Sequence, residues 1–474
     1  MRDRAKLIIL ILFLGLAGVV TALPFVGLYH YAVSLPHTYK DSYYAALPVK
    51  YDRLCTTQNK IVVIGGSSVA FGIDSKLVEQ ELGRPCVNFG LYAAFGLKPM
   101  LDLSLGAIES GDVVIIAPEL SSQMYSDYIG YDYLLQACEG RSDMVQALGY
   151  SYTRGLLSEF PEYLENAKKV NDMGGLNVKG VYALTSFDTY GDIVYERKSN
   201  TMDGYYSADN LPEINATMVS DDFANLLNEY AKCIKEKGAT VYFGFCPINE
   251  LSAASVSQEE KENFVLKLEE VLDFEIISSL EDHIMDAGYF FDSNFHTNDA
   301  GMVYNTVLLI NDLKRSFGTM TATNIEIPAP YTPEIEESVA LAGVSDGFLY
   351  EVTSAGVAIV GLDTEGMTRE ELEIPSQIEN YTVIKISNNA FEGCSAKRIV
   401  FPETITVLSA NIFKDAHALE CVELRSRTLP EVGSSMLAGA NNNVKIYVPE
   451  ELYSNYVTDY FWAIYADSID KLKK

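Results

Sequence analysis

Short apolar runs alternate with amphipathic segments along most of the chain. Residues 61–68, IVVIGGSS, form an apolar run that ends in glycines and serines, and the following DSKLVEQELG has Asp74 in position to cap a helix. Comparable apolar runs recur at residues 86–90, 112–119 and 240–247. Because these runs are apolar on both faces, they are typical of parallel strands covered by helices. The pattern predicts an α/β domain over residues 61–317.

The N-terminal stretch has a different pattern. Residues 7–28, LIILILFLGLAGVVTALPFVGL, hold no charge over 22 positions, which is enough for a helix to cross a bilayer core of about 30 Å. Basic residues dominate the positions before it, and positive charge retained inside would place the bulk of the chain outside the cell. A cleaved signal peptide is the alternative, for which residues 21–23 offer a poor cleavage site. We expect a transmembrane anchor in residues 1–30 and a juxtamembrane segment in residues 31–60.

The pattern changes again after residue 317. Residues 318–345 contain several prolines and no regular periodicity, which predicts a linker. Beyond it, Phe391, Phe413 and Leu437 stand at equivalent points of similar segments, 22 and 24 residues apart. A period in the twenties is typical of a leucine-rich solenoid, in which each coil buries its apolar face only against the next. We therefore expect a repeat domain over residues 346–474.

These segments also resemble a known family. NNAFEGCSAKRIVFPETITVLS, ANIFKDAHALECVELRS and SSMLAGANNNVKIYVPE are similar to the BspA-type leucine-rich repeats of bacterial surface proteins, over roughly residues 347–469. The resemblance implies an extracellular module that binds a surface protein or glycan and has no chemistry of its own.

Composition narrows the classes of function. The chain has 474 residues, of which 35 are Lys or Arg and 65 are Asp or Glu, so the net charge is −30, while 48% of the residues are hydrophobic. So much apolar material excludes disorder as the main state, and so negative a surface argues against a nucleic-acid partner. The seven cysteines are scattered without a C-x-x-C pair. The sequence contains no metal-ligand spacing, phosphate-binding loop or dinucleotide fingerprint, so we expect no metal and no cofactor.

One strand of the α/β region ends in a turn that favours a nucleophile. The run into Gly65-Gly66-Ser67-Ser68 places a serine hydroxyl at the carboxyl edge of a parallel sheet. A serine needs a base to take its proton. His296 has the right context, just before the last helix and with Asp292 four residues upstream, whereas His283 is expected to be a solvated helix residue. Ser67 and His296 are therefore a candidate nucleophile and base.

Three blocks of this region resemble a hydrolase superfamily. VVIGGSSVAFGID, VNFGLYAAFG and DSNFHTNDAG are similar, in the same chain order, to blocks of the SGNH (GDSL-like) hydrolases, over roughly residues 61–317. The membrane-anchored members of bacterial envelopes have the most similar overall organisation. The resemblance implies a three-layer, flavodoxin-like parallel sheet, joined here to an N-terminal transmembrane helix and a C-terminal leucine-rich-repeat solenoid.

The resemblance also implies roles for individual residues. Ser67 falls on the nucleophile, with Ser68 as the less favoured of the pair. His296 falls on the general base and Asp292 on the carboxylate that orients it. Gly90 falls on the second-block glycine, whose backbone N–H forms the oxyanion hole together with the N–H of Ser67.

The chain departs from the family at three points. The usual Asp before the nucleophile is Gly66, and the usual Asp-x-x-His is Asp-x-x-x-His, so both Asp292 and a backbone carbonyl remain candidates to orient the imidazole. Glu119 stands where the third-block asparagine would donate to the oxyanion, and we expect it to be a capping or solvated carboxylate. Asn249 is a candidate replacement donor. Loss of one such donor typically lowers turnover by about 10²–10³-fold.

Two hypotheses of function follow. In the first, the protein is a membrane-anchored serine esterase or O-acyl transferase that acts outside the cell on acylated glycans of the envelope or of a host. In the second, the SGNH-like domain is catalytically silent and the repeats mediate adhesion or protein binding. An asparagine donor about 3 Å from the reaction position of Ser67 would favour the enzyme.

Overall fold

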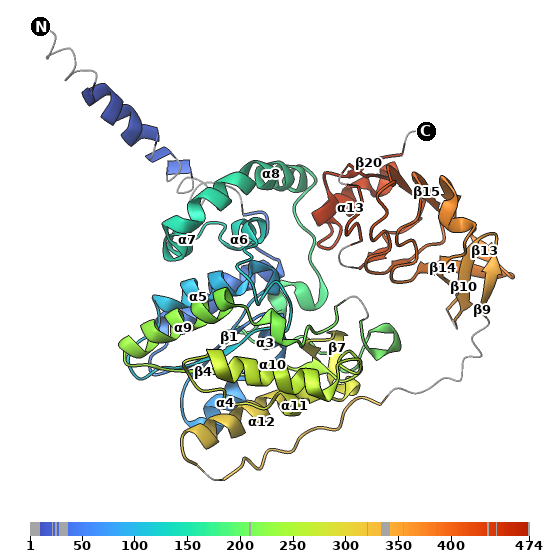
Figure 1. Cartoon of the computed structure of the whole chain (residues 1–474). Helices are drawn as coiled ribbons and strands as arrows, with labels where there is room; N and C mark the ends of the chain where they lie inside the picture. Colours follow the sequence, from blue (N-terminus) through green and yellow to red (C-terminus); the bar gives the residue numbers. More distant parts are fainter. Residues whose placement is uncertain are drawn as a thin grey trace, which may run out of the picture. The chain divides into compact units, whose positions relative to one another are not determined.

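The chain forms two compact units. The computed structural model describes residues 10–20, 22–23, 26–27, 37–207, 210–319, 321–332, 342–353, 355–433, 436–441 and 443–472 (Figure 1). Internal contacts assign residues 1–164 and 180–333 to one unit, here the α/β unit, and residues 165–179 and 334–474 to the other, here the repeat unit.

A parallel sheet forms the centre of the α/β unit. Its order is β2-β1-β3-β4, and every neighbouring pair is parallel. The strands are β1 (Ile61–Gly65), β2 (Cys86–Gly90), β3 (Val113–Ala117) and β4 (Thr240–Phe243). Their residues are buried on both faces, apart from Thr240 at the start of β4. The predicted α/β arrangement with a parallel sheet is confirmed.

Helices cover the sheet on both faces. On one face, α4 (Ser75–Leu82) and α12 (Asp299–Ser316) share a buried apolar cluster with β1 and β3. On the other, α5 (Leu97–Leu105) and α9 (Asp221–Glu236) pack against each other and against β1 and β4 (Figure 1). As predicted, the Asp74 side chain caps α4 by accepting from the N–H of Leu77. Gly83 ends that helix with a φ of 64°, which suits glycine.

Further helices and strands complete the α/β unit. They are α2 (Ala46–Thr56), α3 (Ser67–Gly72), α6 (Tyr131–Ala137), α7 (Ser142–Leu148), α8 (Thr153–Asp172), α10 (Gln258–Val271), α11 (Leu280–His283), β5 (Ile248–Asn249), β6 (Ile284–Met285), β7 (Phe290–Ser293) and β8 (His296–Thr297). The last turns of α8 belong to the repeat unit by their contacts.

Residues 37–60 belong to this unit as well. Tyr43, Leu47 and Leu54 are buried, and α2 packs against β2. The Lys50 Nζ donates to the backbone oxygen of Asn88 at 3.0 Å, and burial lowers the pKa of Lys50 to about 8. The described part of the predicted juxtamembrane segment is therefore a packed part of the α/β unit, whose first core residues precede residue 61.

The predicted anchor is described only in part. Of residues 7–28, positions 7–9, 21, 24, 25 and 28 lie outside the described residues. Residues 10–20 are helical, with exposed apolar side chains such as those of Leu12 and Phe13. Within the described ranges, the structure contains no helix that combines the length and the apolarity needed to span a membrane. The transmembrane anchor stays a prediction.

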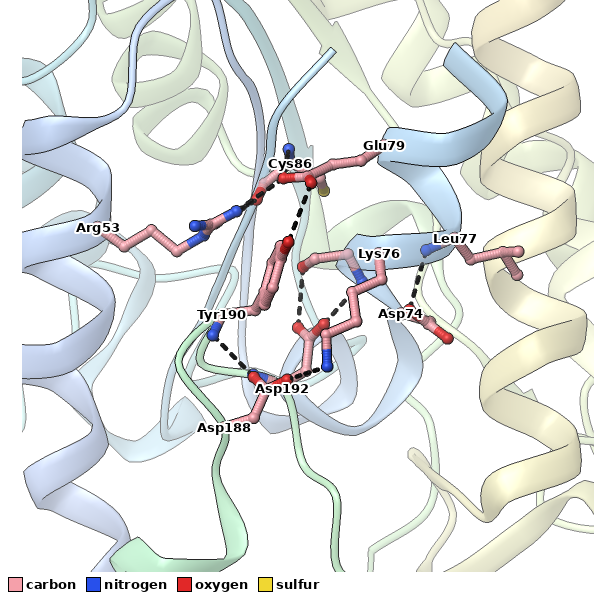
Figure 2. Close-up of polar contacts among 10 residues, drawn as sticks. Arg53, Asp74, Lys76, Leu77, Glu79, Cys86, Asp188, Tyr190 and Asp192 are labelled. Carbon is pink, nitrogen blue, oxygen red and sulfur yellow. Dashed lines mark hydrogen bonds and ion pairs between the residues drawn. The ribbon is translucent and has the colours of Figure 1, made fainter. Parts of the chain in front are cut away.

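Polar contacts fix the segment around residues 188–192 to α4, as Figure 2 shows. The Lys76 Nζ lies 2.6 Å from Asp188 Oδ2, and the Tyr190 hydroxyl donates to Glu79 Oε2 at 3.2 Å. The Arg53 guanidinium lies over the Tyr190 ring, 4.1 Å from its centroid. Asp192 continues the network inward, where it accepts from the Asn88 amide at 3.0 Å. The segment around residues 188–192 is thereby held beside β2, with Asp192 104 positions away from Asn88 in the sequence.

The repeat unit is a solenoid with two sheets. One sheet has the order β12-β15-β17-β19-β20, all parallel, and the other runs β18-β16-β14-β11-β10-β9 with β13 paired to β14. The elements are β9 (Ala342–Ser345), β10 (Phe348–Val352), β11 (Val357–Leu362), β12 (Glu371–Glu373), β13 (Gln377–Ile378), β14 (Tyr381–Ile386), β15 (Arg398–Phe401), β16 (Val407–Leu408), β17 (Cys421–Leu424), β18 (Glu431–Val432), β19 (Lys445–Val448), β20 (Ile469–Lys471) and α13 (Tyr453–Thr458).

The predicted repeat positions are equivalent in the structure. The N–H of Phe391 donates to the Ile412 oxygen, and the N–H of Phe413 donates to the Met436 oxygen, so each coil bonds to the next at the same point. The rings of Phe391 and Phe413 stack with centroids 6.0 Å apart, and Leu437 packs on the same core. The first strand, β9, begins at Ala342 and so lies within the predicted linker.

Candidate active site beyond strands β1 and β3

The turn from β1 into α3 presents Ser67. Gly65 ends the strand, Gly66 precedes the helix, and Ser67 is its first residue. A Cβ on Gly65 would lie 2.3 Å from the Ala117 oxygen, and one on Gly66 would lie 2.6 Å from Glu119 Oε1. The two glycines therefore let the end of β3 approach the turn closely. This approach places Ser67 between segments that are far apart in the sequence.

The structure brings Ser67, His296 and Asp292 together. His296 Nε2 lies 2.7 Å from Ser67 Oγ, and His296 Nδ1 lies 2.7 Å from Asp292 Oδ1. Asp292 and His296 belong to a β7–β8 hairpin in which Ser293 pairs with His296. The hairpin folds the chain back on itself, so the longer Asp-x-x-x-His spacing still delivers a carboxylate to the imidazole.

Further residues hold the imidazole and its carboxylate. The Tyr182 hydroxyl donates to Asp292 Oδ2 at 2.7 Å. The Phe71 ring stacks on His296 with centroids 4.0 Å apart and planes 6° from parallel. Arg197 is fully buried beneath Phe71, 5.2 Å from its ring centroid, and burial lowers the pKa of Arg197. Sequence reasoning missed all three, since only folding brings them to the hairpin.

Glu119 corrects one expectation. It is buried, not solvated, whereas the capping expectation holds: the N–H of Ser68, in the first turn of α3, donates to its Oε1 at 2.6 Å, and the Ser67 hydroxyl donates to the same atom at 2.9 Å. Burial, and then the charge of Glu119, raise the pKa of the Cys246 thiol. A carboxyl group thus occupies the place in which the family resemblance led us to look for an amide.

Two predicted oxyanion donors have other partners. The Gly90 N–H donates to Asn88 Oδ1 at 3.0 Å, and a Cβ on Gly90 would lie 2.1 Å from the Ala70 nitrogen. The Asn249 amide donates to the Tyr205 oxygen at 2.7 Å, and its own oxygen accepts from the Leu251 N–H. Gly90 serves close packing on α3 and Asn249 holds a loop, so their oxyanion roles gain no support from these contacts.

The structure also locates Ser68 and His283, the alternatives to Ser67 and His296. The side chain of Ser68 is fully buried, and His296 contacts Ser67 and not Ser68. His283, expected to be solvated, is buried at the end of α11, where its Nδ1 lies 2.9 Å from the Ser279 oxygen. Burial lowers the pKa of His283. It lines a small cavity together with Asp312 and Cys246, with no Ser67 contact among those described.

Acyl transfer is the chemistry that this arrangement suits. A serine whose hydroxyl contacts a histidine, itself oriented by a carboxylate, can attack an ester carbonyl and form an acyl-enzyme.

All seven cysteines are free thiols. Across the described ranges, no group of three or more His, Cys, Asp or Glu side chains is placed to hold a metal ion.

Comparison with known proteins identifies the repeats. Residues 368–463 match the family described as "BspA type Leucine rich repeat region (6 copies)". The chain is also similar to the crystal structure of a leucine rich cell surface protein from Faecalibacterium prausnitzii A2-165, at 16% identity and a TM-score of 0.17, over 28% of this chain and 32% of that one. No curated protein matches the chain. The predicted BspA-type repeats are confirmed by the family match.

Proposed function

We propose that the α/β unit is a serine esterase or O-acyl transferase of the SGNH type. The observation that carries the proposal is the continuous contact from Asp292 through His296 to Ser67, with both distances 2.7 Å. Ser67 attacks the ester carbonyl while His296 takes its proton. The acyl group then passes from Ser67 to water or to a sugar hydroxyl, with His296 acting as the base again.

The sheet supports the SGNH assignment. The strand order β2-β1-β3-β4 reproduces the first four positions of the flavodoxin-like order 2-1-3-4-5, and a parallel bridge from Phe243 to Ile276 adds a further segment beside β4. Ser67 follows β1 and Glu119 follows β3, so the site lies at the carboxyl edge where the strand order reverses.

The proposed substrates are acyl esters of cell-envelope or host glycans outside the cell. The apolar residues 7–28, with basic residues before them, support a single membrane anchor with the bulk of the chain outside. The BspA-type repeats support a binding module for a surface protein or glycan. Together they would hold an acyl-transfer site close to surface polymers.

A second candidate function is surface binding by the repeats alone. The family match at residues 368–463 favours it, and so does Glu119, because an ionised carboxylate beside Ser67 would oppose a developing oxyanion. In that case the α/β unit is a silent scaffold.

Active-site labelling of the full chain tests the choice. Wild type, Ser67→Ala and His296→Ala are treated with a fluorophosphonate and with short-chain p-nitrophenyl esters. Ser104→Ala is the matched control, since Ser104 is also a buried, hydrogen-bonded serine. We expect wild type and the control to react and both site variants to lose about 10³-fold or more. Equal reaction of wild type and Ser67→Ala, or none by either, rejects the esterase and leaves the binding function.

A further inference from the structure

The Ser67 hydroxyl oxygen lies within hydrogen-bond distance of two atoms that can accept its proton. Ser67 Oγ lies 2.7 Å from His296 Nε2 and 2.9 Å from Glu119 Oε1. A serine hydroxyl donates a single hydrogen bond, so it can satisfy only one of these two acceptors. The other contact brings two lone pairs together unless a further proton lies between them.

Counting protons along the chain of contacts locates this further proton. An ionised Asp292 accepts at both oxygens, from the Tyr182 hydroxyl at Oδ2 and from a proton on His296 Nδ1 at Oδ1. The three contacts Asp292–His296, His296–Ser67 and Ser67–Glu119 then need three protons. A neutral histidine and a serine supply two. The third belongs either to His296 Nε2 or to Glu119, whose Oε1 also accepts from the Ser68 N–H at 2.6 Å.

We propose that Glu119, as a neutral carboxylic acid, is the hydrogen-bond donor that stabilises the oxyanion in this site. The inference rests on the proposed esterase or acyl-transfer function. An ionised Glu119 would repel the developing negative charge, whereas the acid form donates to it. The role given to an asparagine in the family resemblance is then performed by a protonated acid, as carboxylic acids kept neutral in other active sites can do.

The attack step balances with this proton in place. The bond from Ser67 Oγ to the acyl carbon forms as the carbonyl π pair moves onto the carbonyl oxygen. If the extra proton starts on Glu119, the Ser67 proton moves to His296. If it starts on His296, the Ser67 proton moves to Glu119. Both routes end with imidazolium at His296 and a carboxylic acid at Glu119. His296 then protonates the leaving oxygen as its bond to the acyl carbon breaks.

Among the described residues, several charged or titratable groups surround Glu119 and its partners, including Tyr182, whose hydroxyl donates to Asp292 Oδ2. The β7–β8 hairpin presents His296 and, behind it, Asp292, and the segment after β4 presents the Cys246 thiol. Arg197 reaches this cluster through its interaction with Asp292. Glu213 lies beside the segment that follows Glu119, where its N–H donates to the Leu120 oxygen and its carboxylate accepts from the Ser122 N–H. The pH dependence of the reaction is therefore expected to follow the Glu119–Ser67–His296 group.

The pH profile of ester hydrolysis by the full chain tests this inference. Wild type should lose activity as pH rises and the shared proton leaves. Glu119→Gln has a permanent N–H donor and needs only a neutral His296, so its activity should rise to a plateau. The rate ratio of Glu119→Gln to wild type should increase at least about 10-fold between about pH 6 and pH 9. Glu119→Ala should lose about 10²–10³-fold at every pH.

Glu139→Gln is the matched control, because Glu139 is another buried carboxyl, bonded to Tyr163 and to the Tyr39 N–H. It should keep the wild-type profile. Parallel profiles of wild type and Glu119→Gln, or full activity in Glu119→Ala, would overturn the inference and leave the esterase standing. Activity in Glu119→Gln with none in wild type would overturn it too, because Glu119 would then silence Ser67. If no variant shows turnover that depends on Ser67, the proposed function fails and this inference fails with it.

Discussion

The two units of this chain bury different kinds of side chain. In the α/β unit, Lys60 and Asp112 form a buried ion pair with Nζ and Oδ2 2.7 Å apart, and Arg197 is buried as well. In the described part of the repeat unit, the buried polar side chains are those of Ser426 and Thr458, among many apolar ones. Ion pairs of the repeats, such as Arg425 with Glu373, lie at the surface.

The two units therefore use their buried side chains differently: polar networks orient individual groups in the α/β unit, and apolar side chains stack coil on coil in the repeat unit. A buried polar group must find partners with definite geometry, so a network of them fixes directions as well as distances. The α/β unit uses such networks to hold Asn88, Asp292 and Glu119. The repeats stack apolar coils on their neighbours, which requires a period and no particular chemistry. We therefore expect the catalytic site in the α/β unit and an extended binding surface in the repeat unit.

Asp292→Asn should break the chemistry of the α/β unit without unfolding it. An asparagine cannot hold the Nδ1 proton of His296 as a carboxylate does, so the esterase rate should fall by about 10²–10⁴-fold. Ester hydrolysis and thermal melting measure the two effects. Asp143→Asn, which changes an exposed carboxylate paired with Arg141, is the control. Full activity in Asp292→Asn would show that another group orients the imidazole.

Phe413→Ala should damage the repeat unit and spare the active site. Phe413 is fully buried between coils, so its truncation should lower the free energy of unfolding of this unit by about 3–5 kcal/mol. Denaturant titration measures the loss, and fluorophosphonate labelling of Ser67 should proceed at the wild-type rate. Phe461→Ala, at an exposed aromatic position, is the control. Slower labelling of Phe413→Ala under native conditions would contradict the separation of the two units.

Asp312→Asn should show how much an ionised, buried carboxyl group lowers the stability of the α/β unit. Burial raises the pKa of Asp312 from 3.8 to about 7, so the folded chain binds its proton more tightly than the unfolded chain does. The stability from this group is complete below pH 4 and is lost as pH rises toward 7. The free energy of unfolding of the variant should not show this fall, and near pH 8 it should exceed that of wild type by on the order of 1–2 kcal/mol.

Denaturant midpoints of wild type and Asp312→Asn at about pH 4.5 and pH 8 measure the difference. Glu236→Gln, at an exposed carboxylate of α9, should change neither midpoint. A variant that is less stable than wild type at the higher pH would show that Arg315 outweighs burial at this site.

Arg425→Ala should have little effect on the repeat unit. Its guanidinium lies 3.3 Å from both Glu373 and Glu423, and all three side chains reach solvent. Exposed ion pairs contribute about 0–1 kcal/mol, so the denaturant midpoint should move only slightly. A loss above about 2 kcal/mol would mean that surface charge, as well as apolar stacking, stabilises the solenoid.

The local parts of the site could be predicted from sequence. The strand, the two glycines and the serine form one continuous signal, and His296 stands out because few histidines lie in the α/β region. The oxyanion side could not be predicted. Gly90 has the residue type of a donor but packs on α3, while Glu119 was expected to be solvated and contacts Ser67. The contact between Glu119 and Ser67 joins residues 52 positions apart, and no local pattern in the sequence records it.

The alternation of apolar runs determined the parallel sheet, and the period in the twenties determined the solenoid, because both follow from burial that repeats along the chain. The order of Ser67, His296 and Asp292 in the sequence determined which residues were candidates. Only the tertiary structure decided that Asp292 reaches His296 across a hairpin, that Tyr182 and Phe71 hold the imidazole, and that Glu119 faces the nucleophile. Those contacts form where separate helices and strands meet in three dimensions. A single buried polar side chain can fix the geometry of such a contact, and it leaves no repeating pattern in the sequence.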